Sequence, residues 1–183
     1  ANAIWQLAFD WLVTHNFRFS FNILYDEFVL DKIELDSGKE HGRAFSTRIV
    51  YSPIKKNNNF LNIFLSYIFV GTPTFRHGNG YNNFTQRGYP IGWEYGSDGD
   101  EVRLGINYFN KTNIISNFSF GHRRIGFDSI INREYDKFTD YKKGPFPSAP
   151  IDERTFIESN IEYWVRKNFN FLGSIQIDYL RKN

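Results

Sequence analysis

Three acidic residues in a glycine-containing turn are the first candidates for chemistry. The segment "GSDGDE" (Gly96–Glu101) brings Asp98, Asp100 and Glu101 close together in the chain. Carboxylates that converge in a turn bind hard cations such as Ca²⁺, although this segment lacks the length and the run of oxygen ligands of an EF-hand. The sequence therefore predicts either a calcium site or an acidic solvated turn that caps the strand starting at Val102.

The loops around this turn hold aromatic and charged side chains suited to sugar binding. Flat aromatic rings stack on pyranose faces, and guanidinium and amide groups bond to hydroxyls. The candidate polysaccharide-binding residues are Arg76, Tyr81, Arg87, Tyr89, Trp93 and Tyr95, with Tyr135 and Tyr141 from a later loop. The alternative is that these residues pack the loops against one another.

No residue set predicts catalysis. The segment "HGNGYNNF" has spaced glycines, but it does not follow a strand and open a helix, as a dinucleotide-binding fingerprint requires. No serine or carboxylate pair has the spacing of a triad or a glycosidase. The absence of Cys removes thiolate chemistry. With a formal charge of +2 and scattered Lys and Arg, nucleic acid is not an expected partner. We expect a protein that is not an enzyme.

The elements that must position these loops are β-strands. Apolar residues alternate with polar ones, as in Trp5, Leu7 and Phe9 against Gln6 and Asp10, and period two indicates a strand. Eight such segments are present, with no convincing helix; they cover about residues 5–13, 17–25, 44–51, 61–69, 102–108, 114–122, 157–165 and 171–179.

The connections alternate between short turns and long loops at about residues 31–42, 71–100 and 127–153. Short turns at one end and long loops at the other are typical of an antiparallel up-and-down transmembrane β-barrel. We predict an all-β fold in which residues 1–183 form a single barrel domain. No run reaches the about 18 to 20 apolar residues that a spanning helix needs.

The two faces of the predicted strands differ. One carries nearly all the Phe, Ile and Leu, which predicts contact with outer-membrane lipid in a Gram-negative bacterium, and aromatic residues near the short turns match an interfacial belt. The other face carries charges that we expect to line the lumen, namely Asp10, Arg18, Arg48, Arg103, Glu158 and Glu162. The alternative is a soluble β-barrel carrier with its apolar face turned inward.

The direction of the strands predicts a fragment. Outer-membrane barrels normally keep their short turns and both termini on the periplasmic side, whereas both ends of this chain fall on the long-loop side. A closed eight-stranded barrel would also have to bury many charges in its filled interior. We therefore expect a segment of a larger barrel, with the rest of the parent barrel as its partner.

The stretch "RHGNGYNNFTQRGYPIGWEYGSDGDEVRLGINY" resembles the capsule-assembly Wzi-like family of outer-membrane proteins. In that family an Arg-Gly-Xaa-Pro/Leu-Leu/Ile-Gly turn precedes a Gly-Xaa-Asp-Gly/Ala-Asp segment that leads into a barrel strand. "LYDEFVLDK" (24–32) and the terminal hairpin from Ile161 are also similar to later strands of the family. The matching motif positions are Arg87, Gly88, Pro90, Ile91, Gly92, Gly96, Asp98, Gly99 and Asp100.

The resemblance implies a large outer-membrane barrel that anchors or organises capsular polysaccharide by lectin-like binding, with this chain as roughly its C-terminal half. The sequence predicts no cofactor, with Ca²⁺ at the acidic turn as the alternative to a solvated acidic cap. The alternative function is a porin-type channel for hydrophilic solutes in which the loop 71–100 folds inward as a constriction.

Overall fold

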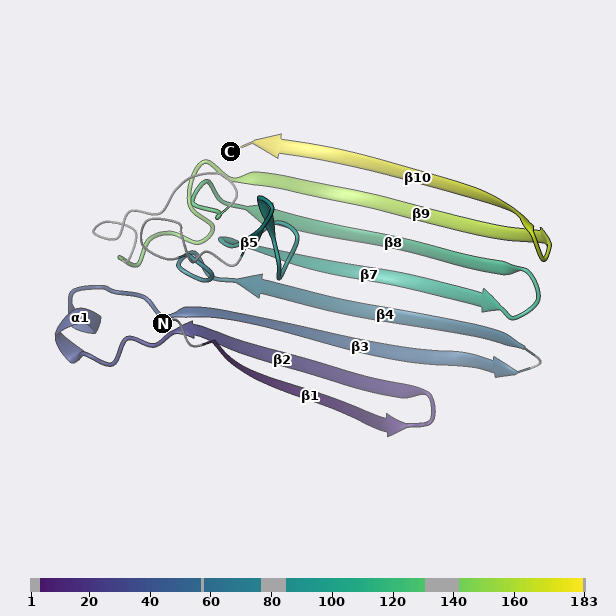
Figure 1. Cartoon of the computed structure of the whole chain (residues 1–183), viewed down its shortest axis with the longest axis horizontal. Helices are drawn as coiled ribbons and strands as arrows, with labels where there is room; N and C mark the ends of the chain where they lie inside the picture. Colours follow the sequence, from purple (N-terminus) through teal and green to yellow (C-terminus); the bar gives the residue numbers. More distant parts are fainter. Residues whose placement is uncertain (1–3, 57, 77–84, 131–141, 183) are drawn as a thin grey trace.

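The computed structural model describes residues 4–56, 58–76, 85–130 and 142–182. Within these residues, eight strands form one antiparallel sheet in the order β1-β2-β3-β4-β7-β8-β9-β10 (Figure 1). The predicted all-β antiparallel fold is confirmed. The strands are β1 (Trp5–Thr14), β2 (Phe17–Glu27), β3 (Gly42–Lys56), β4 (Asn59–Val70), β7 (Gly99–Asn110), β8 (Ile114–Ile125), β9 (Asp152–Arg166) and β10 (Phe169–Lys182).

The sheet is open. Among the described residues, β1 pairs with β2 alone and β10 with β9 alone, so each outer strand has one free edge. Short turns join the strands at one end of the sheet and long loops join them at the other, as the sequence predicted (Figure 1). β1 begins and β10 ends at the long-loop end.

Three small elements lie in the long loops. The helix α1 (Lys32–Asp36) was not expected from the sequence, and it forms because the carboxylate of Asp31 caps it by accepting from the Ile33 backbone N–H at 2.8 Å. β5 (Thr85–Gln86) and β6 (Tyr89–Pro90) make a small hairpin within the loop between β4 and β7. Helices among the described residues are too short to cross a bilayer.

The register of the sheet sorts side chains into two opposite faces. Because successive side chains of a strand point to opposite faces, two neighbouring rows of paired residues can be followed across all eight strands. One row is apolar throughout: Trp11, Phe19, Ile49, Leu65, Leu104, Phe120, Ile157 and Ile177. The next row, on the other face, contains Asp10, Ser20, Arg48, Ser66, Arg103, Gly121, Phe156 and Asp178. We call these the apolar face and the polar face.

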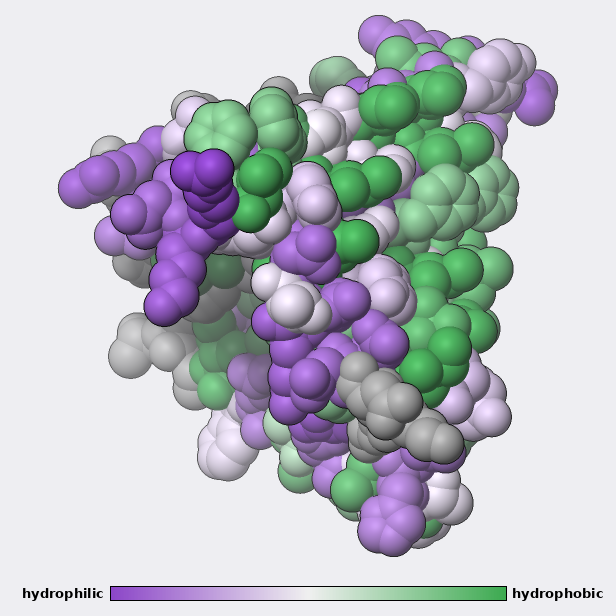
Figure 2. Space-filling model, turned by 90° about the vertical axis from the view of Figure 1, so that its right-hand side faces the viewer, coloured by the Kyte–Doolittle hydropathy of each residue, from purple (hydrophilic) through white to green (hydrophobic). Residues whose placement is uncertain are grey.

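Hydrophobic side chains of the apolar face are open to the surroundings. Leu104 is 50% exposed, Phe120 48% and Ile177 60%. Figure 2, which looks at the sheet from the end of the short turns, shows hydrophobic side chains gathered along the right-hand side, whereas hydrophilic and hydrophobic side chains are mixed elsewhere in the view. The sheet therefore has a continuous apolar surface.

The hydrophobic core is small and lies at the long-loop end. Ala44, Val70 and Phe75 form the buried cluster, with Leu24 and Trp93 among the residues packed against it. Phe75 and Trp93 come from the loop between β4 and β7, whereas the others come from strands, so this loop folds back over the polar face. The fold thus places a loop directly above the charged row.

Candidate ligand-binding site on the polar face

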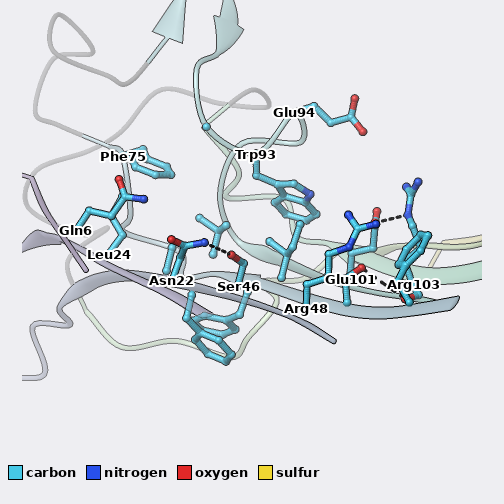
Figure 3. Close-up of a pocket in the computed structure, with 18 residues that line it drawn as sticks. Gln6, Asn22, Leu24, Ser46, Arg48, Phe75, Trp93, Glu94, Glu101 and Arg103 are labelled. Carbon is cyan, nitrogen blue, oxygen red and sulfur yellow. Dashed lines mark hydrogen bonds and ion pairs between the residues drawn. The ribbon is translucent and has the colours of Figure 1, made fainter. Parts of the chain in front are cut away.

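A cavity of about 600 Å³ lies between the polar face of β2, β3, β4 and β7 and the loop above them. The strands contribute polar and charged side chains, including Asn22, Ser46, Arg48 and Arg103. Figure 3 shows the ring of Trp93 reaching from the loop toward the sheet, above these side chains. The site combines an aromatic roof with a floor of polar side chains and of apolar ones such as Leu24, Phe64 and Ile68.

Asp98 holds the roof in place. It is fully buried, and its carboxylate accepts from the Thr72 hydroxyl at 2.8 Å and from the Ser148 backbone N–H at 3.1 Å. Its own carbonyl accepts from the Gly126 N–H at 2.7 Å. Burial raises the pKa of Asp98, and the bonds from Ser148 and Thr72 oppose that shift. One residue, through its side chain and its backbone carbonyl, therefore ties together three loop segments at the long-loop end.

The structure does not bring the three acidic residues of the predicted calcium site together. The carboxylate of Asp98 binds Thr72 and Ser148. That of Asp100 accepts from the Arg124 Nε at 2.9 Å and from the Tyr67 hydroxyl at 3.2 Å. Glu101 points to the polar face. No group of three or more potential metal ligands occurs among the described residues. Successive strand residues point to opposite faces, which is why Asp100 and Glu101 separate.

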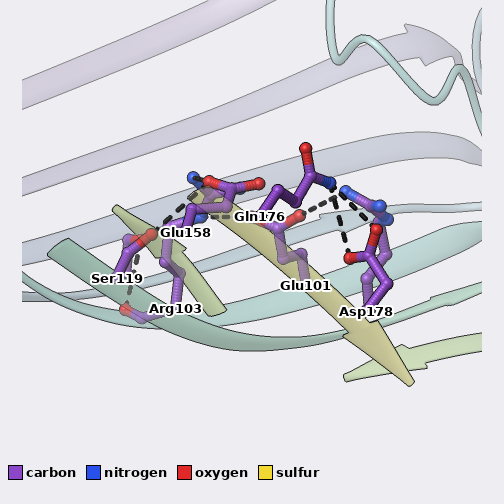
Figure 4. A network of polar contacts seen from close by, with 8 residues as sticks. Glu101, Arg103, Ser119, Glu158, Gln176 and Asp178 are labelled. Atoms are coloured by element: carbon purple, nitrogen blue, oxygen red, sulfur yellow. Dashed lines mark hydrogen bonds and ion pairs between the residues drawn. The ribbon is translucent and has the colours of Figure 1, made fainter. Parts of the chain in front are cut away.

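Glu101 is the centre of an ion-paired cluster on the polar face. Its carboxylate accepts from the Arg103 Nε at 3.0 Å and from the Arg123 Nη1 at 3.1 Å. Arg103 also donates to the Glu158 Oε2 at 2.9 Å (Figure 4). Arg123 is only 3% exposed and Glu101 7%. We call Glu101, Arg103, Arg123 and Glu158 the paired cluster; it balances two positive charges with two negative ones.

The ring of Phe156 supports the paired cluster from the sheet. Its centroid lies 4.8 Å from the Arg103 guanidinium carbon and 5.4 Å from that of Arg123. The ring lies over Gly121 on the neighbouring strand, where an added Cβ would approach the Phe156 Cζ to 2.3 Å. Glycine is required at this position because the ring occupies the space of a side chain.

Arg48 has the same support but a different charge environment. Its guanidinium carbon lies 4.0 Å from the Phe64 centroid, and Phe64 lies over Gly105, where an added Cβ would approach the Phe64 Cζ to 2.4 Å. Within the described part of the chain, no hydrogen bond or ion pair reaches Arg48. Its cross-strand neighbours are the hydroxyl residues Ser20 and Ser66.

Arg48 also lines a second cavity. This cavity, of about 480 Å³, lies nearer the short turns and is lined by polar residues that include Arg18, Ser52 and Asn62. Arg48 is therefore common to these two cavities.

All six charges predicted to face a lumen share the polar face. Arg18 pairs with Asp10 through an Nε–Oδ1 distance of 2.7 Å, and the Ser20 hydroxyl also donates to Asp10 at 3.2 Å. At the short-turn end of β9, Glu162 accepts from the Asn170 amide at 2.6 Å. The alternation of the strands identified this face correctly, with Arg48, Arg103 and Glu158 at its centre.

The candidate sugar-binding residues have different roles in the structure. Trp93 lines the larger cavity, and Arg87 and Tyr89 are exposed on the β5–β6 hairpin. Tyr95 lies with its ring centroid 3.4 Å from the Arg123 guanidinium, and Arg76 is 1% exposed, so both are used in packing. The remaining three, Tyr81, Tyr135 and Tyr141, lie outside the described residues.

Sequence reasoning missed the aromatic supports. Phe64 and Phe156 occupy positions of the polar face, where the alternation predicts polar side chains. The signal that would have found them is an aromatic residue on the polar face with a glycine at the paired position of the next strand, as Phe64 and Gly105 are paired. Gly121 and Phe156 repeat this arrangement.

No protein-family model, curated protein or solved structure matches the chain significantly.

Proposed function

We propose that this chain forms part of a closed transmembrane β-barrel of the bacterial outer membrane, and that it binds surface polysaccharide at its long-loop end. The observation that carries the proposal is the row of eight apolar side chains across the sheet, directly beside a row with Asp10, Arg48, Arg103 and Asp178. Contiguous apolar surfaces of this extent are uncommon on soluble monomers and mark contact with lipid or with another protein.

The polar face supports a barrel rather than a sheet packed on a soluble core. Ion pairs such as Arg103–Glu158 fit a hydrated interior, and they would be costly against an apolar partner. An outer-membrane barrel has this arrangement, with an apolar outer band and a polar interior.

The free edges of β1 and β10 support a larger barrel. Unpaired backbone groups are not tolerated in hydrocarbon, so an open sheet must be closed before it can span a membrane. We propose that strands of a larger parent barrel cover both edges. The similarity of the motif around Arg87–Asp100 to the Wzi-like family supports this assignment.

Polysaccharide binding is supported by the cavity at the long-loop end. Trp93 offers an aromatic surface, and Asn22, Ser46 and Arg48 offer donors and acceptors for hydroxyl groups. The alternative is a porin-type channel for hydrophilic solutes, which is favoured by one observation: Arg48 lines both the cavity under the loop and the cavity nearer the short turns. A continuous path along the polar face would let solutes pass.

Liposome flotation tests the membrane assignment. We expect the protein to float with liposomes, and we expect Leu104→Arg, on the apolar face, to reduce flotation strongly, since an arginine at the bilayer midplane costs about 2–4 kcal/mol. Asn107→Arg, on the polar face of the same strand, is the matched control and should float normally. A protein that stays monomeric in buffer without detergent would contradict the assignment and favour the soluble carrier.

Function is tested by two measurements on the reconstituted protein. We expect purified capsular polysaccharide to retain the protein in a pull-down, and planar bilayers to show no steady conductance. Steady ion conductance without polysaccharide retention would contradict the binding proposal and support the channel.

A further inference from the structure

We infer that Arg48 is the anion-recognition residue of the larger cavity, and that the saccharide bound there carries carboxylate groups. The inference rests on the proposed polysaccharide binding and names the chemical class of the ligand. It follows from the difference between Arg48 and the other arginines of the polar face.

The arginines near Arg48 are already neutralised. Arg103 and Arg123 share Glu101, and Arg103 also pairs with Glu158, so the paired cluster has no free charge for a ligand. Further toward β1, Arg18 is paired with Asp10. Arg48, between these two groups in the sheet, faces serine residues across the strands instead. Its charge is therefore left for a partner outside the described chain.

The guanidinium of Arg48 is positioned by the protein and accessible to such a partner. The ring of Phe64 beneath it, at 4.0 Å, contributes a cation–π interaction worth about 0.5–1 kcal/mol at an exposed site. Phe64 is itself buried and is fixed against Gly105. Since the side chain is exposed to solvent, its donors are accessible. A planar guanidinium matches the geometry of a carboxylate, which it binds through two parallel hydrogen bonds.

The groups around Arg48 suit a sugar ring that carries the carboxylate. Ser46 and Ser66 line the same cavity, and the Asn22 amide donates to the Ser46 hydroxyl at 3.4 Å, which orders this part of the floor. Trp93 extends from the opposite wall toward Arg48 (Figure 3). An acidic sugar can thus place its carboxylate on Arg48, its hydroxyls on the serines and its apolar ring face near the indole.

The experiment compares two probes with the same sugar backbone: an oligogalacturonate and its fully methyl-esterified form. Binding to the protein in detergent is measured by isothermal titration calorimetry. We expect the acid form to bind at least about tenfold more tightly than the ester, corresponding to about 1.4 kcal/mol. Arg48→Gln should bring the two affinities within about threefold of each other, and Arg48→Lys should retain part of the preference.

Controls separate this inference from the function on which it rests. Arg166→Gln removes the same charge at the short-turn end of β9, far from the cavity, and should leave the preference unchanged. Equal binding of the two probes by the unmodified protein, or a preference that survives Arg48→Gln, would overturn the inference and leave polysaccharide binding intact. Binding of neither probe, together with no retention by capsular polysaccharide, would overturn both.

Discussion

The polar face contains two arginine sites built on the same plan. In each, a phenylalanine ring lies over a glycine of the neighbouring strand and supports guanidinium groups: Phe156 over Gly121 in the paired cluster, and Phe64 over Gly105 beneath Arg48. In the paired cluster, Glu101 and Glu158 balance the arginines. Beneath the loop, Arg48 has no such carboxylate among the described residues.

This difference separates a structural role from the binding role proposed for Arg48. Arg123 is almost completely buried and pairs with Glu101. A buried charge needs such a partner to offset the cost of its removal from water. Arg48 is exposed and lines both cavities, so its charge is accessible to solvent and to the proposed ligand. Changes to the paired cluster should therefore alter stability, whereas changes around Arg48 should alter binding.

The largest effect is expected from Glu101→Gln. It removes the carboxylate that Arg103 and Arg123 share and leaves a buried guanidinium without its partner, which costs about 3–5 kcal/mol. The free energy of unfolding is measured by urea titration in detergent. Glu158→Gln is the control. Its loss of unfolding free energy should be smaller, because Glu158 is more exposed than Glu101 and, within the paired cluster, pairs only with Arg103. Equal losses for the two variants would contradict the central role of Glu101.

A smaller loss is expected from Gly121→Ala. The new methyl group would have to displace the ring of Phe156, and overpacking of this kind costs about 1–3 kcal/mol. The same measurement on Gly105→Ala should show a loss of similar size, since Phe64 is as close to Gly105. Gly173→Ala, where an added Cβ meets nothing within 4 Å, is the control and should not be destabilised. If all three variants behave alike, the two rings are not fixed by these glycines.

Ser66→Glu should turn the Arg48 site into a second paired site. Ser66 lies directly across from Arg48 in the register, so a carboxylate there can form a cross-strand ion pair worth about 0.2–1 kcal/mol. We expect a slight gain in unfolding free energy and loss of the preference for the acidic oligosaccharide. Ser66→Gln, which has similar size and no charge, should keep the preference. Loss in both variants would mean that size alone blocks the cavity.

The smallest effect concerns Tyr95, whose ring lies against Arg123 in the paired cluster. Burial, with a hydrogen bond to Glu94, raises the pKa of Tyr95 from 10.0 to about 12, and the charge of Arg123 opposes the shift. Because the folded state keeps this proton longer than the unfolded state, the stability that Tyr95 contributes is complete below pH 10 and is lost as the pH rises toward 12. Tyr95→Phe should remove the last step of tyrosine absorbance in an alkaline titration. If Tyr95→Phe instead removes a step of the absorbance titration near pH 10, the Tyr95 hydroxyl is not buried.

The strands, the two faces and the alternation of short and long connections could be predicted from the sequence, since each depends on local pattern alone. The same alternation located Arg48 and Arg103 on one face. It could not predict that Asp98 is a buried anchor, because Thr72 lies at the opposite end of the same loop and Ser148 lies in the loop between β8 and β9. Nor could it show that Arg48 differs from Arg103, since that depends on which carboxylates lie across the strands.

The free edges of the sheet have a consequence for the protein in isolation. β1 and β10 run antiparallel to each other, so β10 of one molecule can pair with β1 of the next and continue the sheet, with Ile177 and Trp11 on the same side. Such a head-to-tail contact repeats, and it ends in a ring if the rotation closes or in a filament if it does not. Without detergent, the refolded chain is therefore expected to polymerise through these edges.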